Sequence, residues 1–90
     1  MEAKRLGEAI VSSRAAACVN MWPIESAYLE DGVLKSRTEA TLLIKTMEPK
    51  VQEIENLILK AHTYSTPFIG VFEVKRVNRE YKEWMVGAMG

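Results

Sequence analysis

The sequence predicts a single α+β domain over residues 1–90. Apolar residues recur at helical spacing near the start, in the middle and near the end of the chain. Between the first two of these stretches, two runs with strand character flank an Asp-Gly pair, a strong signal for a tight hairpin. Ninety residues suffice for one domain, and a hydrophobic fraction of 48% is typical of a globular chain rather than a disordered one.

The first expected element is a helix over residues 3–17. Spacings of three and four place five residues on its apolar face, namely Ala3, Leu6, Ile10, Ser13 and Ala17. The stretch from Ala15 to Cys18 is small and apolar, so we expect it to pack close to a sheet.

A long hairpin is expected next. Strand character begins at Cys18, is interrupted by Pro23, which belongs on an edge or at a bulge, and resumes as far as residue 29. Asp31-Gly32 supplies the positive φ that a tight turn needs. The second arm covers residues 33–46, with apolar side chains on both faces.

A second helix is expected over residues 48–61, because Pro49 fits the first turn and apolar residues again recur at helical spacing. Residues 62–67 end this helix. Residues 68–74 read as a third strand, apolar on both faces and therefore inside a sheet or an interface. Asn78 is an expected N-cap for a terminal helix whose apolar face carries Tyr81, Trp84, Met85 and Ala88.

This order of elements lacks only an initial strand to become βαββαβ, the split βαβ or ferredoxin-like sandwich. The predicted fold is therefore a ferredoxin-like α+β sandwich without its first strand, with a long hairpin and a short C-terminal helix. Three explanations for the missing strand stay open: a truncated start, a partner chain that fills the gap, or a sheet that closes around it.

Charge and cysteine content limit the function classes. Twelve acidic and twelve basic side chains cancel, which argues against nucleic acid and anionic membranes as partners. The single cysteine, Cys18, cannot form an intrachain disulfide and fits a reducing compartment. With no signal peptide and no membrane-spanning apolar run expected, we predict a cytoplasmic protein.

Two stretches carry a resemblance to a known family. The segment from Ala15 to Pro23, with Ser26, Tyr28 and Leu42–Thr46, resembles the AACVN…P…S.Y…G…LLIKT pattern of the CutA divalent-cation tolerance proteins. Residues 62–67 and Tyr81–Trp84 resemble the family's H.Y..P…YLEWI segment. The resemblance implies a ferredoxin-like homotrimer assembled by strand pairing between subunits. Departures from the pattern, such as Leu29 and Glu30 in place of paired tryptophans, cluster around the hairpin and the cleft between subunits.

Cys18 and His62 are the candidate metal ligands. A thiolate suits Cu(I) and an imidazole suits Cu(II) or Zn(II), so copper or another divalent ion is the expected cofactor, if the protein has one. One chain cannot supply the four ligands of a closed zinc site from residues of this type, whereas three copies around an axis present each residue three times. The competing interpretation makes Cys18 a small buried hydrophobe and His62 a helix C-cap.

A second candidate site follows from the resemblance. Lys45, Tyr64, Tyr81 and Trp84 match family positions that border the cleft between subunits, and they would hold a small anion or a polar ligand there. A purely structural contact is the alternative. We expect no enzyme, because the chain has no phosphate loop or nucleophile elbow, although Cys18 and His62 can be drawn as a nucleophile and a base. The predicted function is metal-ion tolerance or response by a homotrimer; the alternative is a PII-like trimeric module that binds a metabolite or a protein.

Overall fold

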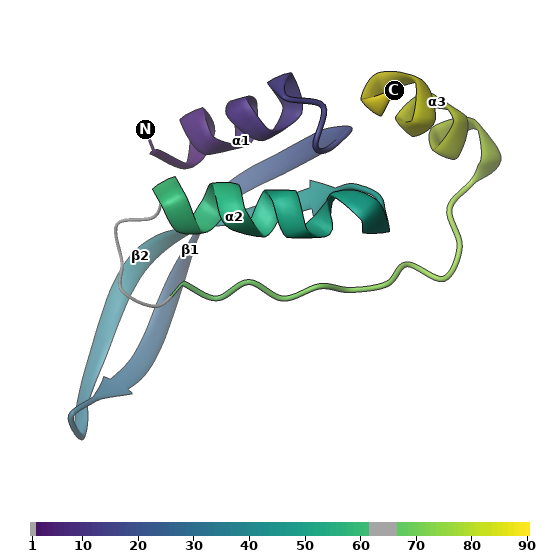
Figure 1. Cartoon of the computed structure of the whole chain (residues 1–90). Helices are drawn as coiled ribbons and strands as arrows, with labels where there is room; N and C mark the ends of the chain where they lie inside the picture. Colours follow the sequence, from purple (N-terminus) through teal and green to yellow (C-terminus); the bar gives the residue numbers. More distant parts are fainter. Residues whose placement is uncertain (1, 62–66) are drawn as a thin grey trace.

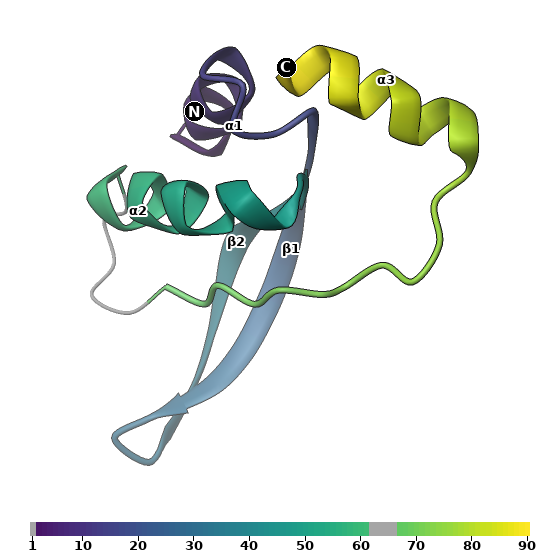
Figure 2. The ribbon, with the colours of Figure 1, turned by 45° about the vertical axis from the view of Figure 1, so that its right-hand side comes forward.

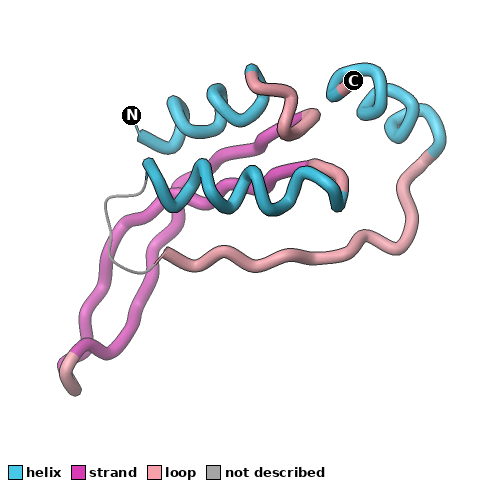
Figure 3. Tube along the Cα trace, in the orientation of Figure 1, coloured by secondary structure: helices cyan, strands magenta, loops and turns pink. Residues whose placement is uncertain are grey.

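The computed structural model describes residues 2–61 and 67–90. In chain order the elements are α1 (Glu2–Ser12), β1 (Cys18–Glu30), β2 (Val33–Lys45), the 3-10 turn η1 (Glu48–Lys50), α2 (Val51–Ala61) and α3 (Arg79–Met89) (Figures 1 and 3). The predicted α+β class is confirmed, with a two-stranded antiparallel sheet in the described residues. None of the helices described is long and apolar enough to cross a membrane.

The hairpin agrees closely with the sequence prediction. β1 and β2 pair along their whole length, from Glu30 opposite Val33 to Cys18 opposite Lys45. The two-residue turn has positive φ at both positions, 51° at Asp31 and 77° at Gly32, as the turn type favoured in hairpins requires. A regular ladder counted from this turn makes every second pair a non-hydrogen-bonded one.

Pro23 lies within β1, opposite Ala40, so the predicted interruption of the strand is wrong. Counting from the turn places Pro23 at a non-hydrogen-bonded position, where its missing N–H would have pointed away from β2. The expectation that this proline lies on an edge is confirmed for the described sheet, because β1 pairs with β2 alone.

The first helix ends at Ser12, five residues earlier than predicted. The Ser13 hydroxyl donates to the carbonyl of Ile10 over 2.9 Å, and Arg14 adopts a left-handed φ of 65°, which turns the chain out of the helix. The three alanines that follow are buried in a loop and not in the helix, so their predicted burial is confirmed and their predicted helical state is not.

Helices α1 and α2 lie side by side and contact one another over one end of the hairpin (Figures 1 and 2). The buried cluster between them is small and consists of Ile10, Ala15, Ala16 and Ile54, with half-buried Leu6, Val19, Ile44, Leu57 and Ile58 around it. The tip of the hairpin projects beyond the helices (Figure 2). The radius of gyration is therefore 14.9 Å, against about 12 Å for a compact chain of this length.

Residues 68–74 form no strand in this structure, which corrects the prediction of a third strand. The chain from 67 to 78 takes an extended course below α2 and leads into α3 (Figures 1 and 2). Its largest side chains are exposed, Phe68 at 90% and Phe72 at 85%. An apolar run of strand-like sequence becomes a strand only beside a partner backbone, and none lies along this segment among the described residues. Asn78 is the N-cap residue of α3, as predicted.

Candidate functional site

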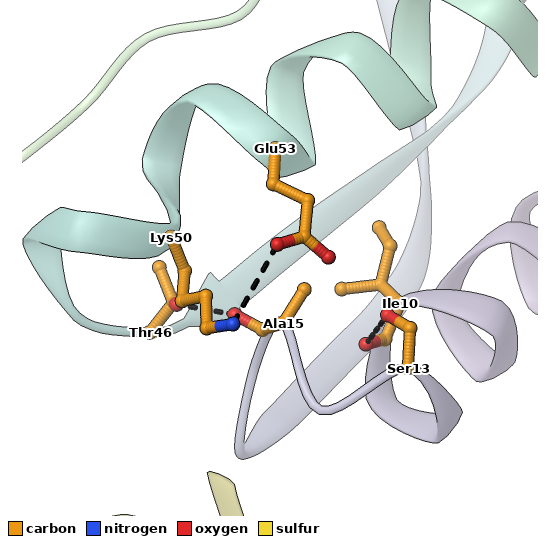
Figure 4. Close-up of polar contacts among 6 residues, drawn as sticks. All are labelled: Ile10, Ser13, Ala15, Thr46, Lys50 and Glu53. Carbon is orange, nitrogen blue, oxygen red and sulfur yellow. Dashed lines mark hydrogen bonds and ion pairs between the residues drawn. The ribbon is translucent and has the colours of Figure 1, made fainter.

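The end of β2 is fastened to the loop that follows α1. The Ala17 N–H donates to the Lys45 carbonyl over 2.9 Å. The Thr46 hydroxyl donates to the Ala15 carbonyl over 2.6 Å, and a 3.6 Å ion pair between Lys50 of η1 and Glu53 of α2 lies nearby (Figure 4). The two hydrogen bonds connect residues that are far apart in sequence, so they fix where the side chain of Lys45 starts.

Lys45 meets the aromatic face of α3. Its ammonium nitrogen lies 5.4 Å from the centroid of the Tyr81 ring, within the range of a cation–π contact. The rings of Tyr81 and Trp84 are 5.3 Å apart and inclined by 47°, a tilted aromatic pair. The structure therefore brings together three of the four residues predicted for the ligand cleft. The fourth, Tyr64, lies outside the described residues.

This cluster of Lys45, Tyr81 and Trp84 is partly exposed to solvent. Lys45 and Tyr81 are half-buried, and Trp84 is 51% exposed. Among the residues described, no carboxylate forms an ion pair with Lys45. A positive group beside an exposed indole face suits a small ligand that carries a negative charge and a flat surface.

Cys18 lies directly across the ladder from Lys45. Directly opposite residues have Cβ atoms about 5 Å apart on the same face of the sheet, so the thiol and the lysine stem share one environment. Cys18 is half-buried, more exposed than the buried hydrophobe of the competing interpretation, and its Sγ lies 3.9 Å from the Asn20 side-chain oxygen. The ammonium of Lys45 disfavours a second cation close to this thiol.

The predicted metal pair is not assembled by the residues that the structure describes. His62 lies outside them, and the described part of the chain contains no group of three or more His, Cys, Asp or Glu side chains placed to hold a metal ion. Cys18 and His62 therefore stay a prediction.

Sequence reasoning missed the pairing of Cys18 with Lys45, although its signal was present. A two-residue turn at Asp31-Gly32 sets Glu30 opposite Val33, and counting outward from that pair reaches Cys18 and Lys45. Two further features of the structure have no clear signal in the sequence. One is the contact of Arg37 with the Tyr28 ring, 5.7 Å from its centroid. The other is an open groove of about 670 Å³ between α1 and α2, lined by Glu2, Arg5, Leu6, Ala9, Leu57, Lys60 and Ala61.

Comparison with known proteins gives a consistent result. The family model described as CutA1 divalent ion tolerance protein matches residues 1–88. The divalent-cation tolerance protein CutA of Archaeoglobus fulgidus is 31% identical over 84 residues, which are 93% of this chain and 82% of that protein. A chloroplastic CutA 1 protein of Oryza sativa is 36% identical over 83 residues, 91% of this chain and 47% of that protein.

Solved structures of CutA proteins also match this chain. The structure of the periplasmic divalent cation tolerance protein CutA from Archaeoglobus fulgidus matches with a TM-score of 0.93 at 29% identity, covering 99% of this chain and 87% of that one. A PII-like protein CutA from Nostoc sp. PCC 7120 in apo form matches with a TM-score of 0.86 at 29% identity, covering 97% of this chain and 86% of that one. On the match over nearly its whole length, this chain belongs to the CutA1 divalent ion tolerance family.

Proposed function

We propose that this protein acts as a homotrimer in tolerance of, or response to, divalent metal ions, with copper as the first candidate. Metal or a small ligand would bind in clefts between subunits. Family membership supports the link to divalent cations. The ferredoxin-like layout, a cytoplasmic location and the absence of enzymatic activity belong to the same proposal.

One observation carries the trimer: among the residues described, more large apolar side chains are exposed than buried. The buried apolar residues in this part of the chain are Ile10, Ala15, Ala16, Ala17, Ile54 and Met85. Large apolar side chains are exposed along the hairpin, along residues 68–77 and on α3, among them Trp22, Leu29, Leu34, Phe72 and Trp84. Contiguous exposed apolar surface marks an association site, and a short chain gains stability by burying it between copies.

The cluster of Lys45, Tyr81 and Trp84 supports a ligand cleft at such an interface. Its lysine has no carboxylate partner in the described chain, and its indole is half-exposed. A neighbouring subunit would cover the exposed part of the cluster, and the lower dielectric there would strengthen ionic contacts of Lys45.

Copper binding is tested by titrating the protein with Cu(II) and Zn(II) in a calorimeter, with tryptophan fluorescence as a second signal. We expect saturable binding with a stoichiometry that is a whole number per trimer. His62→Ala and Cys18→Ser should each weaken it, while Lys45→Met should leave it unchanged or strengthen it by removing a positive charge near the thiol. Identical titrations for the wild type and both ligand variants would eliminate these two residues as ligands.

A PII-like role in binding a small metabolite is the second candidate. The similarity to the Nostoc protein, and a lysine beside an aromatic pair, favour an anionic organic ligand over a bare cation at this site. A thermal-shift screen of nucleotides and organic acids should find a stabilising compound, and Lys45→Met should abolish the shift while Lys50→Met, on an exposed turn, should keep it. A silent screen, combined with metal binding, would reject this second role.

A further inference from the structure

The two rings in the cluster of Lys45, Tyr81 and Trp84 differ in what they can still contact. The Lys45 ammonium lies 5.4 Å from the centroid of the Tyr81 ring, so the chain itself already supplies a partner for this ring. Trp84 is 51% exposed. Because the two rings are inclined by 47°, a flat molecule can stack on only one of them at a time. The indole of Trp84 is therefore the surface available for stacking.

The neighbours of Lys45 in the ladder carry no negative charge. Cys18 lies directly opposite it, and Asn20 lies diagonally across on the same face of the sheet. Leu43, two residues earlier on β2, shares this face and is 47% exposed. None of the described carboxylates forms an ion pair with the Lys45 ammonium. Within the described chain this positive charge is therefore available to an anion.

The cluster offers one cation and not several. Lys45 is the one cation that the described residues place on the rings of this cluster, and Arg79 of α3 is paired with Glu83 over 3.2 Å. The phosphate groups of a nucleotide are usually held by several donors, such as the backbone N–H groups at a helix N-terminus or a set of basic side chains. A carboxylate, with its single charge, matches a single ammonium.

The charge and the stacking surface are close enough for one small molecule. The Lys45 ammonium and the centroid of the Trp84 ring lie 5.4 Å and 5.3 Å from the same point, the centroid of the Tyr81 ring. A carboxylate carried on a ring, or one or two bonds from it, can therefore reach the ammonium while the ring lies on the indole.

We propose that this cluster binds an aromatic monocarboxylate of one or two fused rings. The ring system stacks on the indole of Trp84, and the carboxylate accepts a hydrogen bond from the Lys45 ammonium. Tyr81 is a positioning residue, because it acts through the lysine that it holds. This inference rests on the second candidate function, the binding of a small metabolite, and it names the chemical class of that metabolite.

Three probes of nearly equal size separate the two contacts. Naphthoate has both the flat ring and the charge, decahydronaphthoate keeps the charge without the aromatic ring, and naphthamide keeps the ring without the charge. Isothermal titration calorimetry on the full chain measures the three affinities. We expect naphthoate to bind about fivefold more tightly than the saturated acid, and about tenfold more tightly than the amide. Equal affinities of the three probes would overturn the proposal.

Single variants assign each preference to one side chain. Trp84→Leu should remove the preference for naphthoate over the saturated acid and keep the preference for acid over amide, and Trp84→Phe should restore part of the first preference. Lys45→Met should remove the preference for acid over amide and keep the preference for the aromatic ring. Lys82→Met, at an exposed lysine next to Tyr81, is the matched control and should keep both. A swapped pattern of losses, or a control that behaves like Lys45→Met, would refute the assignment.

The compound screen separates this inference from the function on which it rests. If nucleotides or aliphatic acids stabilise the protein in the thermal-shift screen while naphthoate does not bind, this inference fails and metabolite binding stands. If neither the screen nor naphthoate gives a signal, metabolite binding fails with it. Metal binding is independent of both results, because its candidate ligands are Cys18 and His62.

Discussion

Gly7 lies on α1 where this helix packs tightly against the hairpin. A Cβ at this position would lie 3.0 Å from the Met21 sulfur and 3.2 Å from a methyl carbon of Val19. Gly87, in the last turn of α3, has nothing within 4 Å of the same point. Two helical glycines therefore differ in whether a methyl group fits.

Alanine at the two glycines should have different effects on stability. Gly87→Ala should raise the free energy of unfolding by about 0.5–1 kcal/mol, the ordinary gain from alanine in a helix. Gly7→Ala should give no gain or a loss of about 1 kcal/mol, because the methyl group pushes against Val19. Urea denaturation of both variants measures the difference. Equal gains would mean that α1 does not lie so close to β1.

Thr46 is the polar residue that holds the site in place. Thr46→Val removes the 2.6 Å hydrogen bond to the Ala15 carbonyl and should lower the free energy of unfolding by about 1–2 kcal/mol. Thr46→Ser keeps the hydroxyl and is the matched control. The affinity of the Lys45 cluster for its ligand should fall in the valine variant only. Thermal denaturation measures the change in stability, and a binding assay on the same variants measures the change in affinity.

At the scale of elements, the turn of the hairpin determines the register of the whole sheet. Gly32 adopts a φ of 77°, which costs an L-residue about 1–2 kcal/mol. We expect Gly32→Ala to destabilise the protein by about that amount, and Asp31→Asn, which tolerates the left-handed region, to be nearly neutral. Thermal unfolding followed by circular dichroism measures both. A neutral Gly32→Ala would contradict the tight turn.

The elements that the sequence predicted well are those whose signal is local. Asp31-Gly32 predicted the turn, and the alternating runs on either side predicted both arms. The predicted first helix ends too late, because the apolar spacing continues through Ala17 while the residue that turns the chain out of the helix, a left-handed Arg14, has no distinctive sequence signal. The apolar pattern of residues 68–74 predicts a strand, yet a strand also needs a partner backbone, which no local pattern can supply.

The candidate site was predictable only through the family resemblance. Lys45, Tyr81 and Trp84 lie on β2 and α3, and no spacing in the sequence joins those elements. Their contact is made by the Lys45 side chain, which reaches the Tyr81 ring of α3 from the end of β2. The charge environment of Cys18, in contrast, follows from counting residues outward from the turn.

At the scale of the whole molecule, Leu29 and Leu34 mark the surface that a trimer would bury. They lie opposite one another near the tip of the hairpin and are 71% and 73% exposed. Leu29→Lys with Leu34→Lys should convert a trimer, three times 10.2 kDa, into a 10.2 kDa monomer. Leu59→Lys, on the exposed side of α2, should leave the mass unchanged. Analytical ultracentrifugation measures the mass in solution. A monomeric wild type would reject both the trimer and the cleft between subunits.

The hairpin is one uninterrupted stretch of chain, so its pairs differ in the length of chain that each of them closes. Pairing that begins at Asp31-Gly32 closes a small loop first, and each later pair adds little further entropic cost. Cys18 and Lys45 form the strand pair farthest from the turn, and the Thr46–Ala15 hydrogen bond joins residues 31 positions apart in the sequence. The ligand cluster therefore depends on the pairs farthest from the turn, and fraying at that end alone would separate Lys45 from its position beside α3 while the turn stayed formed.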